Sequence, residues 1–124
     1  MAEPVQLSRI AAVMLGVRDL ATAVTFYKDK LGLKVIMQEP ALALLQCGSV
    51  MLGLSPRHMN ASPLAEAVEV SFGVDNLRAA HKVMVEKGVA FLSEPRQVTP
   101  TDWAVHFRDV DGHLLSFFGP EGKA

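Results

Sequence analysis

The sequence contains little of what would build a disulfide framework, a cysteine metal site or a membrane segment. Among its 124 residues a single cysteine, Cys47, can form no internal disulfide and belongs to no Cys-x-x-Cys pair. No apolar run approaches the roughly 20 residues that span a bilayer. The N-terminus, Met-Ala-Glu-Pro, lacks the basic start and apolar core of a signal peptide. We therefore expect a soluble, cytoplasmic protein that is held together by a hydrophobic core.

Aromatic side chains and an excess charge of one sign are also scarce. Twelve basic and 13 acidic residues leave a formal net charge of −1, and aromatic residues make up 6% of the chain. A chain this close to neutral lacks the positive potential that attracts nucleic acid. We expect neither a nucleic-acid partner nor a membrane partner. Half of the residues are hydrophobic, which suffices for one domain that buries roughly two-thirds of its unfolded surface.

What the sequence does contain is an internal repeat with an offset of 57 residues, from position 13 to position 70. The repeat pairs Val13 with Val70, Gly16 with Gly73, Val17 with Val74, Leu20 with Leu77 and Ala23 with Ala80. Each copy predicts a strand, a capping residue, an amphipathic helix and a glycine stop. The caps are Asp19 and Asn76, and the stops are Gly32 and Gly88, with one residue fewer in the second copy. Such a repeat indicates two copies of one structural unit.

Side-chain alternation and turn residues divide the rest of the chain into strands. Strands are predicted at 10–17, 33–37, 42–46, 50–54, 67–74, 89–92, 103–108 and 113–118, and helices at 20–31 and 77–87. The proline- and serine-rich segment Ser55–Pro63 is predicted to link the two halves. Asp111-Gly112 predicts a hairpin between the last two strands. The order β-α-β-β-β, found twice, predicts an α+β fold.

Two motifs in these modules point to a known family. The first motif is Val-Arg-Asp-Leu…Phe-Tyr-x-x-x-Leu-Gly-Leu, and the second is Phe-Arg-Asp-x-Asp-Gly-His-Leu-Leu. In this order the sequence resembles the glyoxalase/bleomycin-resistance/extradiol-dioxygenase group, the vicinal-oxygen-chelate superfamily. The resemblance covers nearly the whole chain. It implies a single domain over 5–120, an open eight-stranded half-barrel of modules 9–56 and 66–119, and a homodimer that completes two pockets. It implies no single chemistry, because the family includes isomerases, epimerases, dioxygenases, thiol transferases and antibiotic-binding proteins.

The resemblance also allows the family's metal ligands to be mapped. Its catalytic members hold a divalent metal with four side chains, usually His, Gln or Glu, from four strands. These positions fall on Ala12, Gly53, Glu69 and Ser116. One carboxylate does not supply the three or more protein donors that such a metal needs. We therefore expect no cofactor. The alternative is a divalent metal held by Glu69, by His106 and by a third residue that the sequence does not identify.

Alternation along the strands selects the candidate ligand-binding residues, and no catalytic residue is assigned. The candidates are Glu69, His106, Trp103, Met14, Ser71, Ser116 and Arg108. His106 shares a face with Arg108, opposite Trp103. A carboxylate in an apolar hollow needs a partner such as Arg108 or a cationic ligand; the alternative is an open cavity in which Glu69 is hydrated. Trp103 either stacks on a planar ligand or packs in the core.

These observations predict a small-molecule-binding protein without the family's catalytic metal. We expect a partly apolar ligand that can also be cationic, held in the manner of the bleomycin-resistance proteins. The methionines support an apolar ligand, since methionine-rich surfaces adapt to apolar molecules of different shapes. The first alternative is a metal-dependent lyase, isomerase or dioxygenase with an altered ligand set. The second is a domain that only mediates association.

Overall fold

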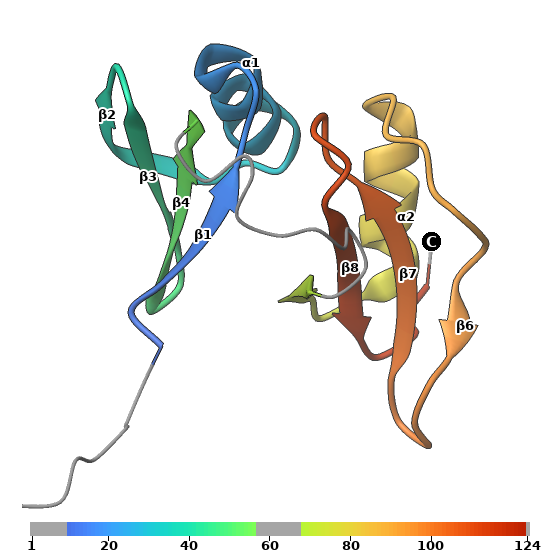
Figure 1. The fold of residues 1–124 in the computed structure, drawn as a ribbon. Helices are drawn as coiled ribbons and strands as arrows, with labels where there is room; N and C mark the ends of the chain where they lie inside the picture. The colour runs from blue at the N-terminus through green and yellow to red at the C-terminus, as the bar shows by residue number, and fades with distance from the viewer. Residues whose placement is uncertain (1–9, 57–67, 124) are drawn as a thin grey trace, which may run out of the picture.

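The computed structural model describes residues 10–56 and 68–123. In these ranges eight strands form two four-stranded sheets (Figure 1). The first module comprises β1 (Ala12–Gly16), α1 (Leu20–Thr25), the π-helical turn η1 (Phe26–Lys30), β2 (Lys34–Glu39), β3 (Leu42–Cys47) and β4 (Val50–Ser55). The second comprises β5 (Glu69–Gly73), α2 (Leu77–Glu86), β6 (Arg96–Gln97), β7 (Trp103–Arg108) and β8 (Leu114–Gly119). The predicted α+β fold of two βαβββ modules is confirmed.

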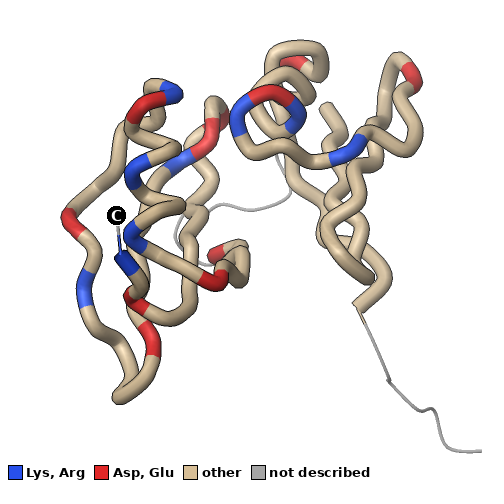
Figure 2. Tube along the Cα trace, turned by 180° about the vertical axis from the view of Figure 1, so that it is seen from behind, with Lys and Arg blue, Asp and Glu red and all other residues tan. Residues whose placement is uncertain are grey.

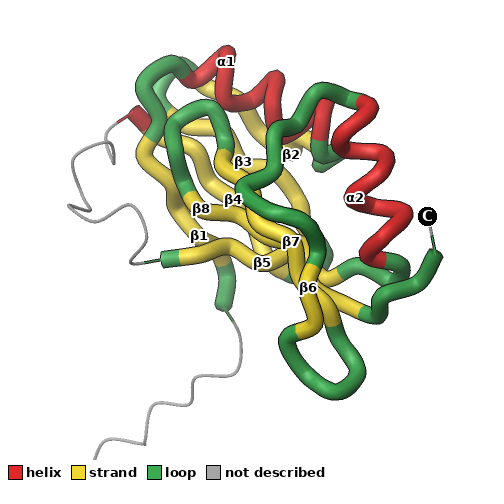
Figure 3. Tube along the Cα trace, turned by 90° about the vertical axis from the view of Figure 1, so that its right-hand side faces the viewer, coloured by secondary structure: helices red, strands yellow, loops and turns green. Residues whose placement is uncertain are grey.

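The repeat seen in the sequence is also a repeat of topology. The strand orders are β1-β4-β3-β2 and β5-β8-β7-β6. In each sheet the first strand of the module lies parallel to the last, with Val13 opposite Leu52 and Val70 opposite Leu115. The helices α1 and α2 gather on one side of the strands (Figure 3). Each sheet therefore has a face that packs on its helix and an open face.

Alternation along the strands divides the side chains between these two faces. The helix-side residues join one hydrophobic cluster with the helices, and they include Val13, Leu15, Leu45, Leu52, Leu54, Val70, Phe72, Val105, Phe107, Leu115 and Phe117. The residues between them point to the open faces. A single cluster that draws on both modules means that the two helices and the helix-side faces share one core.

The one-residue difference between the two copies appears as a π-helical turn. Both helices are capped as predicted, with Asp19 accepting from the Thr22 amide at 3.3 Å and Asn76 accepting from the Ala79 amide at 3.0 Å. The first copy has one residue more before its glycine stop, and there the Leu31 amide donates to the Phe26 carbonyl at 3.3 Å. This i to i+5 bond is that of a π-turn, which absorbs one extra residue without breaking the helix.

The predicted strand at 89–92 is wrong. Phe91 makes a single bridge to Phe107, and the regular pairing with β7 comes later, where Arg96 lies opposite Ala104 and Gln97 opposite Trp103. The Phe91 ring packs in the core, with its centroid 5.2 Å from that of Phe107. The apolar pattern that suggested a strand therefore reflects burial of one ring, and Pro95, which has no amide hydrogen to donate, precedes the true strand.

The residues after β8 hold the start of α2, a role that the sequence did not reveal. The Leu77 amide donates to the Pro120 carbonyl and the Arg78 amide to the Glu121 carbonyl, each at 2.9 Å. The amide groups of a first helical turn have no partner inside the helix. The tail supplies carbonyl acceptors for two of these amides. The Arg78 guanidinium also pairs with Glu121 at 2.9 Å.

Several predicted boundaries lie outside the described residues. These are the domain start at 5, the module starts at 9 and 66, and the linker from 57 onward. No helix in the described ranges is long and apolar enough to cross a membrane. Figure 2 shows residues of both charge signs interspersed over the two modules, as the near-zero net charge suggested.

A buried carboxylate, Asp109, joins the two modules. The Tyr27 hydroxyl on η1 donates to Asp109 Oδ2 at 2.6 Å, and His113 Nδ1 lies 2.7 Å from the same oxygen. The other oxygen accepts from the amides of Asp111 and His113 at 2.9 and 2.8 Å. Asp111 Oδ1 in turn accepts from the Arg18 amide at 2.9 Å. The β7–β8 hairpin is thus bonded to the first module at two places, at Arg18 before α1 and at Tyr27 within η1.

The protonation states of this network follow from its contacts. Burial alone would raise the pKa of Asp109, but the hydrogen bonds from His113, Tyr27 and the backbone hold that pKa below its usual value. The bond to Asp109 raises the pKa of His113 against the opposing effect of burial. Burial, reinforced by Asp109, raises the pKa of Tyr27, so the phenol remains a donor.

Replacing Tyr27 by Phe is expected to lower the free energy of unfolding by about 2 kcal/mol, because the variant loses a buried hydrogen bond to a charged acceptor. Urea denaturation of the purified chain measures the effect. Thr25→Ala, an exposed change on the same helix, is the control and should leave stability nearly unchanged. Equal stability of Tyr27→Phe and the wild type would contradict the role of this bond.

The His113 contact predicts a pH dependence of stability. The raised pKa of His113 gives a contribution to the free energy of unfolding. This contribution is complete below the pKa of about 6.5 in the unfolded chain and is lost as the pH rises through the pKa in the folded chain. The lowered pKa of Asp109 gives a contribution that is lost only as the pH falls well below about 4. Between about pH 6 and about pH 9 the wild type should therefore lose more unfolding free energy than His113→Gln. Parallel curves for the two proteins would show that the pair contributes nothing.

Candidate functional site

Three of the predicted site residues form a bonded cluster on the open face of the second sheet. Ser116 on β8 donates its hydroxyl to Glu69 Oε2 at 2.5 Å, and His106 Nε2 on β7 lies 3.3 Å from the same oxygen. The register sets Ser71, Ser116 and His106 in one row across β5, β8 and β7. Glu69, two residues before Ser71, lies on the same face. The alternation that placed these residues together in the sequence is correct.

The cluster is within reach of solvent. The side chain of Glu69 is 35% exposed and that of His106 is 22% exposed, whereas Ser116 beneath them is 1% exposed. Glu69 therefore meets the requirement that a partly buried carboxylate have partners, and these partners include Ser116 and His106. Arg108 lies one row further toward the hairpin and donates Nη1 to the Gly112 carbonyl at 3.0 Å.

The order of the hydrogen bonds limits what this cluster can do chemically. Ser116 donates to the carboxylate and not to the imidazole, so His106 does not act on this hydroxyl as the base of a serine–histidine pair. Glu69 Oε2 lies 3.3 Å from Nε2 of His106, which leaves Nδ1 as the second polar atom of the ring. The arrangement suits recognition of a polar group or a single proton transfer at His106.

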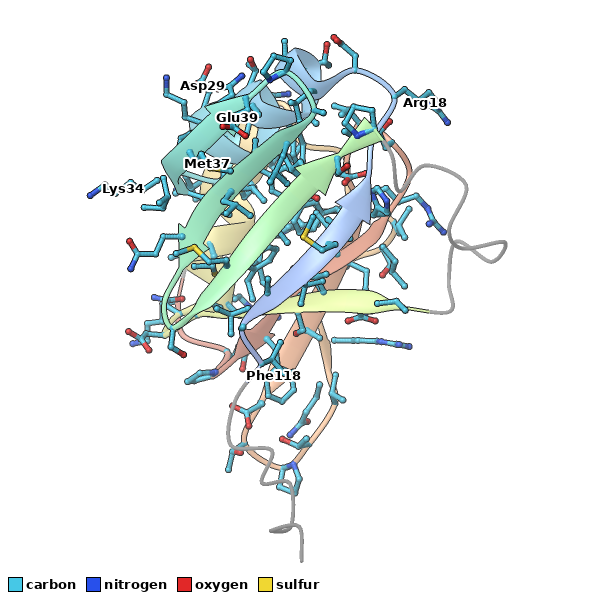
Figure 4. The ribbon with its side chains drawn as sticks, turned by 60° about the vertical axis from the view of Figure 1, so that its left-hand side comes forward. Arg18, Asp29, Lys34, Met37, Glu39 and Phe118 are labelled. Carbon is cyan, nitrogen blue, oxygen red and sulfur yellow. The ribbon has the colours of Figure 1, made fainter. Side chains whose placement is uncertain are left out.

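The equivalent row of the first sheet is apolar. By the same register, Met14, Gly53 and Leu44 correspond to Ser71, Ser116 and His106. A Cβ atom built on Gly53 would fall on the Met14 thioether and lie 3.3 Å from Leu44 Cδ2. Met14 therefore lies over the glycine. Figure 4 views this sheet from its open side, with α1 behind it and Met37 on β2.

Two of the predicted ligand contacts are not brought to the cluster. Trp103 lies on the helix-facing side of β7, where the Arg78 guanidinium sits 5.0 Å from the ring centroid. Met14 lies on the other sheet. The open face of the second sheet thus holds five of the seven candidates, Glu69, Ser71, His106, Arg108 and Ser116. Two open surface grooves near the start of α1 contain none of the seven.

Comparison with known proteins places this architecture. The sequence profile of the Glyoxalase/Bleomycin resistance protein/Dioxygenase superfamily matches residues 9–117. The chain belongs to this superfamily. The resemblance noted in the motifs is thereby confirmed over nearly the whole chain.

The relatives within the superfamily are distant. An uncharacterised protein of Bacillus subtilis (strain 168), YraH, is 26% identical over 89% of this chain and 97% of its own. The antibiotic-binding protein TnmS3 from Streptomyces sp. CB03234 has a TM-score of 0.80 at 20% identity, covering 94% of this chain and 99% of that one. Lactoylglutathione lyase from Agrobacterium tumefaciens has a TM-score of 0.76 at 21% identity, covering 90% and 93%. At such identities these two structures show the fold alone.

The donor set at the superfamily's four metal positions does not fit a divalent metal. Ala12 and Gly53 carry no donor side chain, and the Met14 thioether occupies the space above Gly53. The other two positions, Glu69 and Ser116, are hydrogen-bonded to each other. In the described ranges no three His, Cys, Asp or Glu side chains come close enough to hold a metal ion. A hydroxyl and one carboxylate are a poor substitute for three anionic or imidazole ligands.

One charged residue of the open face was missed in the sequence. Arg96 lies opposite Ala104, which alternates with His106 and Arg108, so it belongs to the same face. It was overlooked because the strand was predicted at 89–92. The signal that could have found it is Glu94-Pro95, since a strand that follows this break brings Arg96 alongside β7.

Proposed function

We propose that this chain is a metal-independent small-molecule-binding protein of the glyoxalase/bleomycin-resistance type. The observation that carries the proposal is the bond between Glu69 and Ser116, two positions at which catalytic relatives hold a metal. Ala12 and Gly53, which have no donor side chain, occupy the other two of these four positions. Together the four positions offer hydrogen-bonding groups for a small molecule but not the ligands that a metal ion needs. The Streptomyces protein of similar fold, described as antibiotic-binding, is a precedent for binding on this scaffold.

We also propose that the pocket is completed by a second copy of the chain. The open face of the first sheet carries apolar side chains, among them Leu44 and Met14, and Met14 is 37% exposed. An exposed apolar patch of this kind is what a partner surface covers. The polar face with Glu69 and His106 and the apolar face with Met14 are unlike, so a two-fold dimer can pair one with the other twice. A ligand held between them would touch both kinds of surface.

The alternative, a metal-dependent lyase, isomerase or dioxygenase, is favoured by one contact. Glu69 and His106 lie 3.3 Å apart and could both turn toward a cation, although a third protein ligand is missing from the described residues around them. The remaining alternative is a domain that only mediates association. We further propose that the protein works in the cytoplasm, because a lone cysteine requires no oxidising compartment.

Metal analysis tests the proposal directly. Protein purified without chelator is expected to hold Zn, Ni, Mn or Fe well below one equivalent, and addition of these ions should not raise the melting temperature, because the donors are too few. In contrast, members of a broad ligand library should raise it with and without metal. A variant carrying Ala12→His, Gly53→Glu, Ser116→Glu and Met14→Ala restores four ligands and serves as the positive control. Stoichiometric metal in the wild type that is lost in Glu69→Gln would contradict the metal-independent proposal and favour the enzyme alternative, and a library without any hit would favour the association domain.

Light scattering tests the dimer. The expected mass is twice the 13.4 kDa of one chain. Met14→Lys should shift the mass toward the monomer, because it buries a positive charge against a partner face that carries Arg96 and Arg108, while Lys82→Gln on the exposed side of α2 should leave the mass unchanged. A wild-type mass of one chain at working concentration would contradict the shared pocket.

A further inference from the structure

We propose that Glu69 binds a hydrogen-bond donor of the ligand, a hydroxyl or ammonium group attached to an aromatic body that packs on Phe118. This inference rests on the proposed binding function and gives the chemical class of its ligand. It includes the cationic ligand expected from the sequence as one case, because an ammonium group is also a donor.

The two oxygens of the Glu69 carboxylate have different surroundings. Oε2 accepts from the Ser116 hydroxyl at 2.5 Å and lies 3.3 Å from His106 Nε2. A carboxylate offers about four acceptor sites, and in the described ranges no protein donor reaches Oε1. Because Ser116 is 1% exposed and the Glu69 side chain is 35% exposed, the oxygen bonded to Ser116 is the one held against the sheet. Oε1 is therefore the acceptor that a ligand meets.

The charged groups of this face disfavour a ligand that offers only acceptors. Arg108 Nη1 donates to the Gly112 carbonyl at the hairpin at 3.0 Å, and Arg96 lies on the exposed edge strand β6, opposite Ala104. The charge nearest to Oε1 is therefore that of Glu69 itself. A ligand carboxylate placed there would stand against a like charge, which is destabilising. A hydroxyl or ammonium hydrogen would be attracted.

A second polar group lies beside this acceptor. Ser71 is exposed and pairs with Ser116 in the register of β5 and β8, so it lies next to the serine that holds Glu69. A serine hydroxyl can either donate or accept. Ser71 can therefore donate to the oxygen of a ligand hydroxyl or accept from an ammonium group, and it serves both forms of the proposed ligand.

The same face has an apolar surface and open space one row away. Phe118, visible below the first sheet in Figure 4, follows Ser116 by two residues on β8, is 36% exposed and lies opposite Gly73. A strand rises by about 3.4 Å per residue, so this row is about 7 Å from that of Ser116. A Cβ atom built on Gly73 would meet nothing within 4 Å, which leaves room for a ring beside Phe118. A fused aromatic ring can pack there while its substituent reaches Glu69.

Closure by a second copy would make the donor group necessary. In the proposed dimer the apolar row of Met14, Gly53 and Leu44 would cover the cluster and exclude water from it. A carboxylate oxygen that loses its water without gaining a donor raises the free energy of the complex. A ligand with a donor restores the lost hydrogen bond, and a ligand with only acceptors does not.

Calorimetric titration of the full chain with four matched probes tests the inference. The probes are 1-(2-naphthyl)ethanol, 1-(2-naphthyl)ethylamine, 2-acetonaphthone and 2-naphthoate, which have the same ring and the same number of non-hydrogen atoms. The alcohol and the amine can donate, whereas the ketone and the carboxylate can only accept. The alcohol and the amine should bind at least about tenfold more tightly than the ketone, as hydrogen bonds to a charged acceptor imply, and the carboxylate should bind most weakly.

Variants then assign the effect to this face. Glu69→Gln should weaken binding of the alcohol and the amine about tenfold and should not weaken binding of the ketone, because the amide group of glutamine can donate to a carbonyl. Undiminished ketone binding also shows that the variant is folded. Glu86→Gln makes the same change on the exposed side of α2 and should affect none of the probes. Phe118→Ala should weaken binding of all four alike.

The outcomes separate this inference from the proposed function. Ketone or carboxylate binding as tight as that of the alcohol, or alcohol binding that survives Glu69→Gln, would overturn the donor while leaving a binding protein. Unchanged binding of every probe by Phe118→Ala would overturn the position of the ring. If none of the four probes binds, hits from the thermal-shift library replace them: hits that lose about tenfold affinity in Glu69→Gln would support the donor, and hits that do not would overturn it. A library without any hit would overturn the binding function and the donor together.

Discussion

The arrangement of the two modules depends on one buried carboxylate. Asp109 sits at the end of β7, accepts bonds from Tyr27 and His113, and lowers the cost of its own burial by satisfying both oxygens. Because Tyr27 belongs to one module and Asp109 to the other, the bond between them fixes how the two helices share a core. The open faces, and with them the candidate site, take their positions from this contact.

The two modules carry chemically different side chains at equivalent positions, polar in the second sheet and apolar in the first. The row that carries Ser71, Ser116 and His106 in one sheet carries Met14, Gly53 and Leu44 in the other. The backbone pairing is the same, so the difference lies entirely in the side chains. A fold that keeps its strand register while its open faces change is well suited to acquire new ligands, and this explains why a superfamily of one shape includes both enzymes and binding proteins.

Much of the fold follows from the sequence because its signals are local. Asp19 and Asn76 precede apolar stripes of helical spacing, and Val13 and Val70 lie in strands that alternate cleanly, so the caps, the faces and the repeat could all be predicted. The pairing of Glu69 with His106 was within reach for the same reason, since side-chain parity set both on one face.

What could not be predicted depends on contacts between distant residues. The bond from Tyr27 to Asp109 spans 82 positions, and no periodicity reports it. The edge strand that carries Arg96 is two residues long, which is too short to show alternation. The tail after Gly119 looks like a polar end, and its bonds to α2 appear only once the sheet has brought the two together.

The π-turn at Phe26–Lys30 has a consequence for how such a chain could arise by duplication. Had the two halves stayed identical, the first helix would end like α2, without the wider turn that carries Tyr27. By the 57-residue offset Tyr27 corresponds to Met84, and the matching bonds from the Leu33 amide to the Tyr27 carbonyl and from the Val89 amide to the Met84 carbonyl place the extra residue after Tyr27. The extra residue therefore leaves the direction of the phenol unchanged. An exact duplicate of the second half would carry methionine at this position, so the bond to Asp109 depends on the difference in side chain between the two copies.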